Sequence, residues 1–397
     1  MNKSERSFRL AVIGAGGRGR MARLAHRPED GFRLVAAADP DPAALEPYRK
    51  DFGPEFGLYT DHRELLDREN PDGVFVCSPD FLHEEQGLDV LRRGCTLYLE
   101  KPLAITTQGC DRLLDAGGPT GERLYVGHNL RFFPVFRKMH SWLREGRIGE
   151  VQAIWCRHFI SYGGDAYFKD WHSERRFSTG LLLQKGSHDI DIIHWLAGSY
   201  TRRTTAIGKL SVYNQVANRR APDEKPVTAF ARENWPPLSQ KGLSPVIDVE
   251  DHSMVLLELE NRVQASYLQC HYTPDDHRNY TIIGTEGRIE NCGDTSRDDR
   301  MATLRLWNYR CGYEEEGTEA VKIPRISGDH GGADRLIIDD FLHFLRTGER
   351  RGASPLDARM SVAAGFSATE SLRDGGTPRE VPPYQLQKPP SDHHAPG

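Results

Sequence analysis

The chain has 397 residues, of which 38% are hydrophobic and 27% are charged, a balance typical of a globular protein and not of a disordered one. This length is enough for two domains of ordinary size. The formal net charge is -5, so electrostatic capture of nucleic acid or of an anionic membrane surface is not expected.

The seven cysteines are scattered along the chain and form no C-x-x-C pair. This spacing argues against a disulfide framework or a zinc site, so we expect free thiols, a reducing cytoplasm and no metal. The N-terminus lacks the apolar segment of a signal peptide, and no run elsewhere is long enough to span a bilayer. The sequence therefore predicts a cytoplasmic protein without a membrane partner.

The first third of the chain alternates short β-rich runs with helical stretches. Strands are expected at 8–16, 32–42, 71–79, 95–103 and 123–129, and helices at 19–28, 61–70, 83–94 and 108–118. The second of these strands is expected to end in a proline-broken turn that reaches Pro42. Alternation of this kind predicts an α/β domain with a doubly wound parallel sheet, which we assign to residues 1–127.

The pattern changes after Asn129. A helix at 133–149 and a strand at 150–161 lead to a helix from Leu181, and β-rich runs then follow at 204–214, 251–272, 279–291 and 303–310. Few helices separate these runs, which favours a mainly antiparallel sheet in an α+β domain over residues 128–330. Helices are expected at 334–349 and 356–375 within a C-terminal segment 331–385, before a flexible tail at 386–397. A polar stretch at 218–245 is expected to be a long surface loop.

A glycine-rich turn follows the first predicted strand. Gly14, Gly16 and Gly19 stand in G-x-G-x-x-G spacing where a strand gives way to a helix. Such glycines permit a tight turn, let backbone N–H groups approach a pyrophosphate, and let the helix pack closely on the strand. We therefore expect a Rossmann dinucleotide-binding domain whose cofactor contacts include these glycines, Gly17 and Arg18. A tight turn without a ligand is the structural alternative.

The second predicted strand reaches Asp39, 20 residues after Gly19. A carboxylate at this position accepts hydrogen bonds from the adenine-ribose hydroxyls and repels a 2′-phosphate. NAD is therefore favoured over NADP, although Arg18 inside the glycine loop leaves some room for NADP.

The ends of the next two core strands carry polar residues. Ser78 and Pro79 end one strand ahead of His83, and Glu100 and Lys101 end the other. Ligands of doubly wound sheets lie at the carboxyl ends of the strands, so we expect all five residues to lie near the cofactor. A lysine at that edge can have its pKa lowered enough for acid–base chemistry, whereas a plain surface turn is the alternative.

These segments together resemble the Gfo/Idh/MocA family, the glucose-fructose oxidoreductase and inositol dehydrogenase group. The resemblance spans essentially the whole chain and rests on VIGAGGRG, CSPDFLH, EKP, VGHNLRFFP, the helix from Leu181 and GTEGRIEN. It implies that Lys101 is catalytic, between nicotinamide and substrate, and that Pro102 follows a cis peptide. Asn129 and Arg131 stand where family members border the active site, so we assign the first to the cofactor and the second to the substrate.

The same resemblance implies how the domains are arranged. The second domain is expected to be a large open sheet that covers the cofactor cleft and mediates assembly into a homodimer or homotetramer. The terminal helices are expected to return to the first domain.

The family's substrate helix reads D-x-G-x-H-x-x-D, and here the pattern falls on Gln184, Gly186, His188 and Asp191. Gln184, His188 and Asp191 share one helical face. We expect His188, with an unperturbed pKa of about 6.5, to be catalytic by accepting a hydroxyl proton, and Gln184 and Asp191 to bind substrate. Gln184 departs from the family's aspartate, because glutamine cannot take a proton or tune a neighbouring cation through charge.

Two other charges on this helix leave alternatives open. Lys185 and Asp189 lie four residues apart, so they form an ordinary helical ion pair, or Lys185 reaches the pocket and binds substrate. His194 is expected to be structural, and His330 is a further residue expected to approach the cleft.

An aromatic segment precedes the substrate helix. It contains Tyr162, Tyr167, Trp171, Arg175 and Arg176 among others. Aromatic faces stack on sugar C–H surfaces and arginine forks bind carboxylates, which suits a sugar, a glycoside or a sugar acid, and we name Tyr162 and Trp171 as substrate contacts. A subunit interface is the alternative, since these residue types are enriched there too.

Three functions follow from these residues. The first is an NAD-dependent oxidoreductase that transfers a hydride between a sugar, cyclitol or related hydroxyl and nicotinamide. The second is an NAD-cycling glycosidase or lyase that oxidises the sugar transiently with no net redox change. The third is a non-catalytic NAD-binding sensor, against which the presence of both Lys101 and His188 counts.

Overall fold

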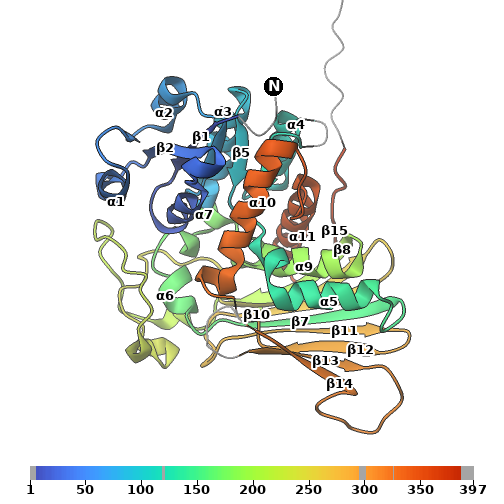
Figure 1. Ribbon diagram of the computed structural model, residues 1–397. Helices are drawn as coiled ribbons and strands as arrows, with labels where there is room; N and C mark the ends of the chain where they lie inside the picture. Colours follow the sequence, from blue (N-terminus) through green and yellow to red (C-terminus); the bar gives the residue numbers. More distant parts are fainter. Residues whose placement is uncertain (1–5, 119–120, 295–300, 325, 386–397) are drawn as a thin grey trace, which may run out of the picture.

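The computed structural model describes residues 6–118, 121–294, 301–324 and 326–385. Two sheets form the frame of the molecule, and several long helices lie between them (Figure 1). The expected flexible tail at 386–397 lies outside the described residues.

The first sheet has six parallel strands in the order β3-β2-β1-β4-β5-β6. Its strands are β1 (Phe8–Ile13), β2 (Phe32–Ala38), β3 (Gly57–Tyr59), β4 (Gly73–Val76), β5 (Thr96–Leu99) and β6 (Leu124–Val126). The strand order reverses direction between β1 and β4, and their carboxyl ends flank the point at which doubly wound sheets bind ligands. The predicted Rossmann architecture is confirmed.

The helices of this part differ in detail from the sequence prediction. They are a 3-10 helix at Gly17–Ala25, α1 (Pro42–Phe52), α2 (His62–Glu69), α3 (His83–Arg92) and α4 (Thr107–Gly117). The helix expected at 19–28 is therefore present as a 3-10 helix that begins two residues earlier and ends at Ala25. The expected proline turn is instead the start of α1, because Pro42 tolerates the first helical turn and Asp41 accepts a capping hydrogen bond from the Ala43 N–H. Neither α1 nor the short β3 was expected, since prolines at both 42 and 47 interrupt the helical pattern.

The second sheet has nine strands in the order β14-β13-β12-β11-β7-β10-β9-β8-β15. Its strands are β7 (Val151–Phe159), β8 (Thr201–Lys209), β9 (His252–Leu259), β10 (Gln264–Cys270), β11 (His277–Gly284), β12 (Arg288–Cys292), β13 (Ala302–Trp307), β14 (Glu319–Ile323) and β15 (Arg379–Glu380). Among the described strands of this sheet, only β7 and β10 pair in parallel, so the expected mainly antiparallel sheet is confirmed. Alternation along β7 turns Ile154, Cys156 and His158 toward the helices.

Helices cover the inner face of this sheet and connect it to the first domain. They are α5 (Pro134–Arg144), α8 (Leu181–Gln184) and α9 (Gly186–Ala197), with the short α6 (Gly163–Tyr167) and α7 (Arg175–Ser178) at one end. The single helix expected from Leu181 breaks at Lys185. This break matters for the site, because it leaves the last carbonyl of α8 without an intrahelical partner.

Two C-terminal helices run between the domains (Figure 1). The first, α10 (Ala333–Thr347), packs on the 3-10 helix Gly17–Ala25, and the second, α11 (Pro355–Arg373), packs on α4, α8, α9 and β8. Close packing of α11 on α8 needs a glycine, because a Cβ at Gly365 would lie 2.9 Å from the Leu182 carbonyl oxygen. Arg359 of α11 forms a 2.8 Å ion pair with Asp111 of α4.

The segment 218–245 is a mostly exposed loop with two short 3-10 turns, Arg232–Asn234 and Pro237–Ser239. It crosses toward the first domain, where Lys225 Nζ lies 3.2 Å from Asp41 Oδ2. Across the described ranges, none of the helices combines the length and the apolar character needed to cross a bilayer.

Candidate active site

A cavity of about 1310 Å³ lies between the two domains. Its walls come from the carboxyl ends of β1, β2, β4 and β5, from the junction of α8 and α9, and from β7 and β11 of the second sheet. The cavity therefore includes the switch point of the Rossmann sheet. Most of the expected site residues line it, and these are Gly14, Gly16, Gly17, Arg18, Asp39, Ser78, Pro79, His83, Glu100, Lys101, Asn129, Tyr162, Trp171, Gln184, Lys185 and His188.

The glycine loop is shaped by close backbone contacts. Gly14 has a positive φ of 82°, and a Cβ there would lie 2.6 Å from the backbone nitrogen of Ser78. A Cβ at Gly19 would lie 1.8 Å from the Gly14 carbonyl oxygen, so Gly19 lets the 3-10 helix pack on the strand but does not itself line the cavity. Space above Gly17 is open within 4 Å. Glycine is therefore required at positions 14 and 19, and the resulting cradle fits a pyrophosphate.

Asp39 lies at the end of β2 beside this cradle. Its Oδ2 accepts a 2.9 Å hydrogen bond from the Ala15 N–H, and its Oδ1 accepts a 2.9 Å bond from the Asp41 N–H. The carboxylate is thus held at the rim of the loop, where a ribose diol of a dinucleotide would lie.

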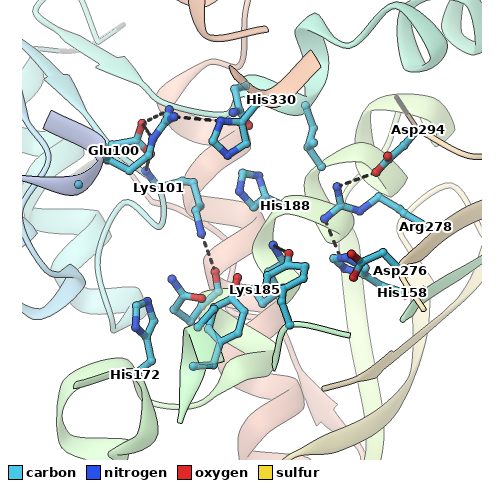
Figure 2. A pocket seen from close by; sticks show the side chains of 18 of the residues that line it. Glu100, Lys101, His158, His172, Lys185, His188, Asp276, Arg278, Asp294 and His330 are labelled. Atoms are coloured by element: carbon cyan, nitrogen blue, oxygen red, sulfur yellow. Dashed lines mark hydrogen bonds and ion pairs between the residues drawn. The ribbon is translucent and has the colours of Figure 1, made fainter. Parts of the chain in front are cut away.

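Arg18 points away from Asp39. Its Nη2 lies 2.7 Å from Glu100 Oε1, and its Nη1 lies 2.6 Å from Asp334 Oδ2 on α10. His330 Nδ1 lies 2.9 Å from the same Asp334 oxygen, so this residue approaches the cavity as a part of the Arg18 cluster (Figure 2). The cluster ties the glycine loop to α10, and the arginine is engaged there instead of facing the ribose.

The ends of β4 and β5 are joined by His83. Its Nδ1 lies 2.7 Å from the Pro102 carbonyl oxygen and its Nε2 lies 2.9 Å from the Ser78 carbonyl oxygen. The Lys101–Pro102 peptide is cis, as the resemblance implied. His83 therefore fixes the segment that carries Lys101, and Asn129 is held nearby by donating a 3.2 Å hydrogen bond to Asp334.

Lys101 extends from the end of β5 into the cavity. Its Nζ donates a 3.2 Å hydrogen bond to the backbone carbonyl of Gln184. Burial lowers the pKa of Lys101 to about 8, and the nearby Asp80 carboxylate opposes this shift most strongly. An amine with this pKa can exchange a proton near neutral pH.

His188 faces the same space from α9 (Figure 2). Burial, together with the positive charges of Lys101 and Lys185, holds the pKa of His188 well below its usual value. Its Nδ1 is buried and has no hydrogen-bond partner within the described part of the chain. The ring is therefore a neutral imidazole beside the cavity, able to hydrogen-bond a ligand.

The two alternatives for Lys185 are now distinguished. Lys185 lines the cavity, and its Nζ donates a 3.3 Å hydrogen bond to the Tyr162 hydroxyl. Asp189 instead faces the second sheet, where it lies 3.0 Å from both Arg278 Nε and His158 Nδ1. Successive residues of α9 thus serve different surfaces, because His188 faces the cavity and Asp189 holds the helix on the sheet.

Asp191 and Arg131 do not line the cavity, which corrects their expected contact with substrate. Asp191 is fully buried, and its two oxygens accept bonds of 2.7 and 2.9 Å from the Arg131 guanidinium. Arg131 also lies 3.3 Å from Asp357 of α11. The physical reason is mutual neutralisation: a buried carboxylate needs a partner, and this pair joins α9 to the loop before α5.

The aromatic segment contributes one wall of the cavity. Tyr162, Tyr167, Trp171 and His172 line it, and the Trp171 and His172 rings stack with centroids 3.6 Å apart. The neighbouring arginines are engaged elsewhere, since Arg175 pairs with Glu250 at 2.9 Å and Arg176 pairs with Glu174 at 2.8 Å. They do not line the cavity.

Several cavity residues were not expected from the sequence. They are Asp80 after β4, and His158, Asp276, Arg278 and Asp294 on the side of the second sheet. Strand alternation could have placed His158 on the inner face of β7 together with Cys156, but only the pairing of β7 with β11 brings Arg278 beside it. Asp80 belongs to the CSPDFLH motif, whose position at the end of β4 is a signal that could have placed it in the cavity.

Comparisons with known proteins agree with this architecture. Residues 8–128 match the NAD-binding Rossmann fold of the GFO_IDH_MocA oxidoreductase family, and residues 141–381 match the C-terminal alpha/beta domain of that family. Oxidoreductase YteT of Bacillus subtilis (strain 168) is 26% identical over 380 residues, or 85% of this chain and 86% of that protein. Inositol 2-dehydrogenase of Burkholderia multivorans is 30% identical over 195 residues, 48% of this chain and 55% of that enzyme.

Solved structures share the fold. Levoglucosan dehydrogenase in complex with NADH has a TM-score of 0.76 at 19% identity, covering 95% of this chain and 100% of that chain. Aldose-aldose oxidoreductase from Caulobacter crescentus has a TM-score of 0.71 at 19% identity over 95% and 100% of the two chains. Both family matches fall on the two domains that enclose the cavity, and the chain belongs to the Gfo/Idh/MocA family of oxidoreductases, with an NAD-binding Rossmann domain.

Proposed function

We propose that this protein is an NAD-dependent dehydrogenase that oxidises a CH–OH group of a sugar or cyclitol. The observation that carries the proposal is that Lys101 and His188 point into one cavity that also contains the glycine cradle and Asp39. Two similar proteins are named for substrates of this class. They are inositol 2-dehydrogenase and levoglucosan dehydrogenase.

The preference for NAD over NADP rests on two side chains. The Asp39 carboxylate lies where it would accept hydrogen bonds from the ribose hydroxyls and repel a 2′-phosphate. Arg18 is the cation that could have paired with the 2′-phosphate of NADP, but it forms ion pairs with Glu100 and Asp334. Gly14, Gly16 and the other loop residues would hold the pyrophosphate.

Lys101 is the stronger candidate for the proton acceptor. Its pKa of about 8 lies near neutral pH, where general bases work best, whereas the much lower pKa of His188 makes that imidazole a weak base. We therefore assign the hydroxyl proton to Lys101 Nζ and an orienting hydrogen bond to His188. NAD, when bound in the glycine cradle, would supply the acceptor for the hydride of the carbinol carbon, so the hydroxyl would become a carbonyl and its proton would remain on Lys101.

The substrate's remaining hydroxyl groups would meet the other walls. Gln184, Lys185 and Tyr162 lie on one side of Lys101, and Trp171 offers an aromatic face. Stacking on that face and hydrogen bonds from these groups suit a polyhydroxylated ring. The substrate contacts assigned to Gln184, Lys185, Tyr162 and Trp171 are part of this proposal.

The test is NADH formation, with NAD and separately with NADP, across free sugars, inositols, sugar acids and glycosides. Steady NADH formation with one class would support the proposal and name the substrate class. Release of an aglycone without NADH would overturn it in favour of the NAD-cycling glycosidase. Cofactor binding with neither activity, unchanged by Lys101→Ala, would overturn it in favour of a sensor.

Assembly through the open face of the second sheet is a separate proposal. Four large apolar side chains of β7, β8 and β9 are exposed on one face: Trp155 at 50%, Ile207 at 60%, Met254 at 50% and Leu256 at 63%. The strand register places Met254 directly opposite Ile207, and it places Leu256 in the same cross-strand row as Trp155, with β10 between them. A contiguous exposed apolar patch favours burial in an interface, so we propose a homo-oligomer through this face.

A further inference from the structure

Asp80 is a buried acid that none of the roles above uses. It follows the end of β4, lines the cavity and is only 5% exposed. Its Oδ2 is buried without a hydrogen-bond partner among the residues described. Burying a carboxylate is costly unless a neighbouring charge or ligand compensates it, so its location needs an explanation.

The groups that face Asp80 come from four separate segments. They are His83 of α3, Lys101 after β5, His172 of the aromatic segment, and the side chain of Gln184 in α8. Burial raises the pKa of Asp80, while these three cationic or titratable neighbours and a hydrogen bond with Gln184 oppose that rise. Among them, Lys101 is the ammonium group that extends into the reacting part of the cavity.

Asp80 and Lys101 belong to adjacent segments, because His83 bonds both the Ser78 carbonyl oxygen ahead of Asp80 and the Pro102 carbonyl oxygen after Lys101, and both side chains line the cavity. The charges around Lys101 agree with this placement. Lys185 and Arg18 disfavour its charged form, whereas Asp80 and Glu100 favour it, and Asp80 has the larger effect. Glu100 is already occupied, because its Oε1 pairs with Arg18 at 2.7 Å. His188 is neutral beside Lys101 and adds no compensating charge.

We propose that Asp80 is the positioning carboxylate of Lys101, holding its amine toward the substrate and stabilising the ammonium that forms when Lys101 takes the hydroxyl proton. It would supply the negative charge that the family pattern places on the helix, where this chain has Gln184. In this arrangement the amide of Gln184 bridges the acid to the helix, and the carboxylate lies on the cofactor side of the cavity instead of the substrate side. The role rests on the proposed function of Lys101.

A purely structural role for Asp80 makes a different prediction. Asp80 lies in the first turn of a 3-10 helix, Asp80–Leu82, that leads into α3, and an acid at such a position also stabilises a helix start. A capping role would leave the titration of Lys101 unchanged when Asp80 is neutralised. The titration of Lys101 therefore separates the two roles.

The experiment measures the titration of the Lys101 amine directly. Competitive labelling of the full-length protein with a trace of acetic anhydride, read by mass spectrometry at Lys101, gives the midpoint pH with and without NAD. Asp80→Asn should lower this midpoint by about 1 pH unit, because loss of a nearby opposite charge disfavours the ammonium. The matched control is Glu85→Gln, which removes the same charge from an exposed position of α3 that pairs with Arg63, and should leave the midpoint unchanged.

A second pair of variants keeps the test decisive. Asp80→Ser should lower the Lys101 midpoint in the same way, and it serves if Asn disturbs the turn. Asp80→Asn combined with Gln184→Glu should return the midpoint toward the wild-type value, because it moves the carboxylate to the neighbouring side chain. An unmoved midpoint in both folded neutral variants would overturn the proposal. A double variant that stays at the Asp80→Asn midpoint would contradict the exchange of a carboxylate between positions 80 and 184.

The labelling needs neither substrate nor turnover, so its outcome is separate from that of the proposed function. A shifted Lys101 midpoint without dehydrogenase activity on any substrate would keep the Asp80 assignment and reject the dehydrogenase. Dehydrogenase activity together with an unmoved Lys101 midpoint in Asp80→Asn would support the dehydrogenase and reject the Asp80 assignment. With an active substrate, Asp80→Asn should also move the rising limb of the pH–kcat profile to lower pH, while the affinity for NAD changes little.

Discussion

The Nζ atom of Lys101 donates a 3.2 Å hydrogen bond to the backbone carbonyl of Gln184, the last residue of α8. This carbonyl is available because the helix breaks at Lys185, and the last carbonyls of a helix have no intrahelical partner. Lys101 belongs to the Rossmann domain, whereas Gln184 leads into the helix that carries His188. One hydrogen bond thus joins the Rossmann domain to the junction of α8 and α9 across the cavity.

Replacing Lys101 by Met should remove the proton acceptor and keep the apolar stem. We expect kcat to fall by about 10²–10⁴-fold, the usual contribution of general acid–base catalysis, with NAD binding retained. Steady-state kinetics together with a calorimetric titration of NAD check both parts. The control is Lys50→Met on the exposed surface of α1, which should leave kcat unchanged; a Lys101→Met enzyme with normal kcat would refute the assignment.

The pH dependence of oxidation should follow Lys101. Because its neutral form accepts the proton, kcat/KM should rise with pH through about 8 and level off above it, in line with the lowered pKa of this residue. Titration of His188 should not change kcat/KM near neutral pH, since burial keeps the pKa of this histidine well below its usual value. Rate profiles of the wild type and of His188→Asn check this: a limb near neutral pH that disappears in His188→Asn would mean that the histidine is the base.

Asp39 should determine the choice between NAD and NADP. Asp39→Ser removes a carboxylate that would bond the ribose and repel a 2′-phosphate, so NAD affinity should fall and NADP affinity should rise, each by about 10–100-fold, the range expected for a hydrogen bond to a charged group. Binding titrations with both cofactors measure this. Asp41→Asn is the matched control, because it neutralises the adjacent acid that caps α1 and pairs with Lys225. Equal effects of the two variants would rule out a specific role for Asp39.

Much of the fold could be predicted because the signals are local. The apolar run of β1 followed by Gly14 and Gly16, and the β-rich runs after Asn129, each carry their own period and turn residues. The helix α1 was hidden because prolines at 42 and 47 suggest a turn, although Pro42 is suited to a first helical turn. The 3-10 helix Gly17–Ala25 packs against α10, a long-range contact that no local pattern reveals.

The site divides in the same way. Lys101 and His188 could be predicted because each belongs to a motif on one segment. Arg131 and Asp191 also belong to motifs, but they form a buried ion pair with each other. This pair could not be predicted, because it depends on how α9 packs against the segment before α5. The wall that carries Arg278 could not be predicted, since it depends on long-range pairing of β11 with β7.

Asp191 should matter for stability more than for substrate contact. Asp191→Asn leaves Arg131 buried and only partly neutralised, which should lower the free energy of unfolding by about 3–5 kcal/mol. Arg131 holds the pKa of Asp191 below its unfolded value, so this stability is present above pH 4 or so and is lost as the pH falls below that. Denaturant unfolding at neutral and acid pH measures both effects. If the wild type and Asp191→Asn unfold alike at neutral pH, the pair is not stabilising.

The exposed face of the second sheet should control assembly. Leu256→Glu places a charge in the middle of the apolar patch formed with Trp155, Ile207 and Met254, so it should convert an oligomer into monomers by making burial of that face costly. Size-exclusion chromatography with light scattering measures the mass of the assembly. The control is Trp235→Glu, which charges an apolar side chain that is 46% exposed on the 218–245 loop, away from this face, and should leave the mass unchanged. A wild-type protein that is monomeric at all concentrations, or a Leu256→Glu variant with unaltered mass, would show that this sheet face is not the interface.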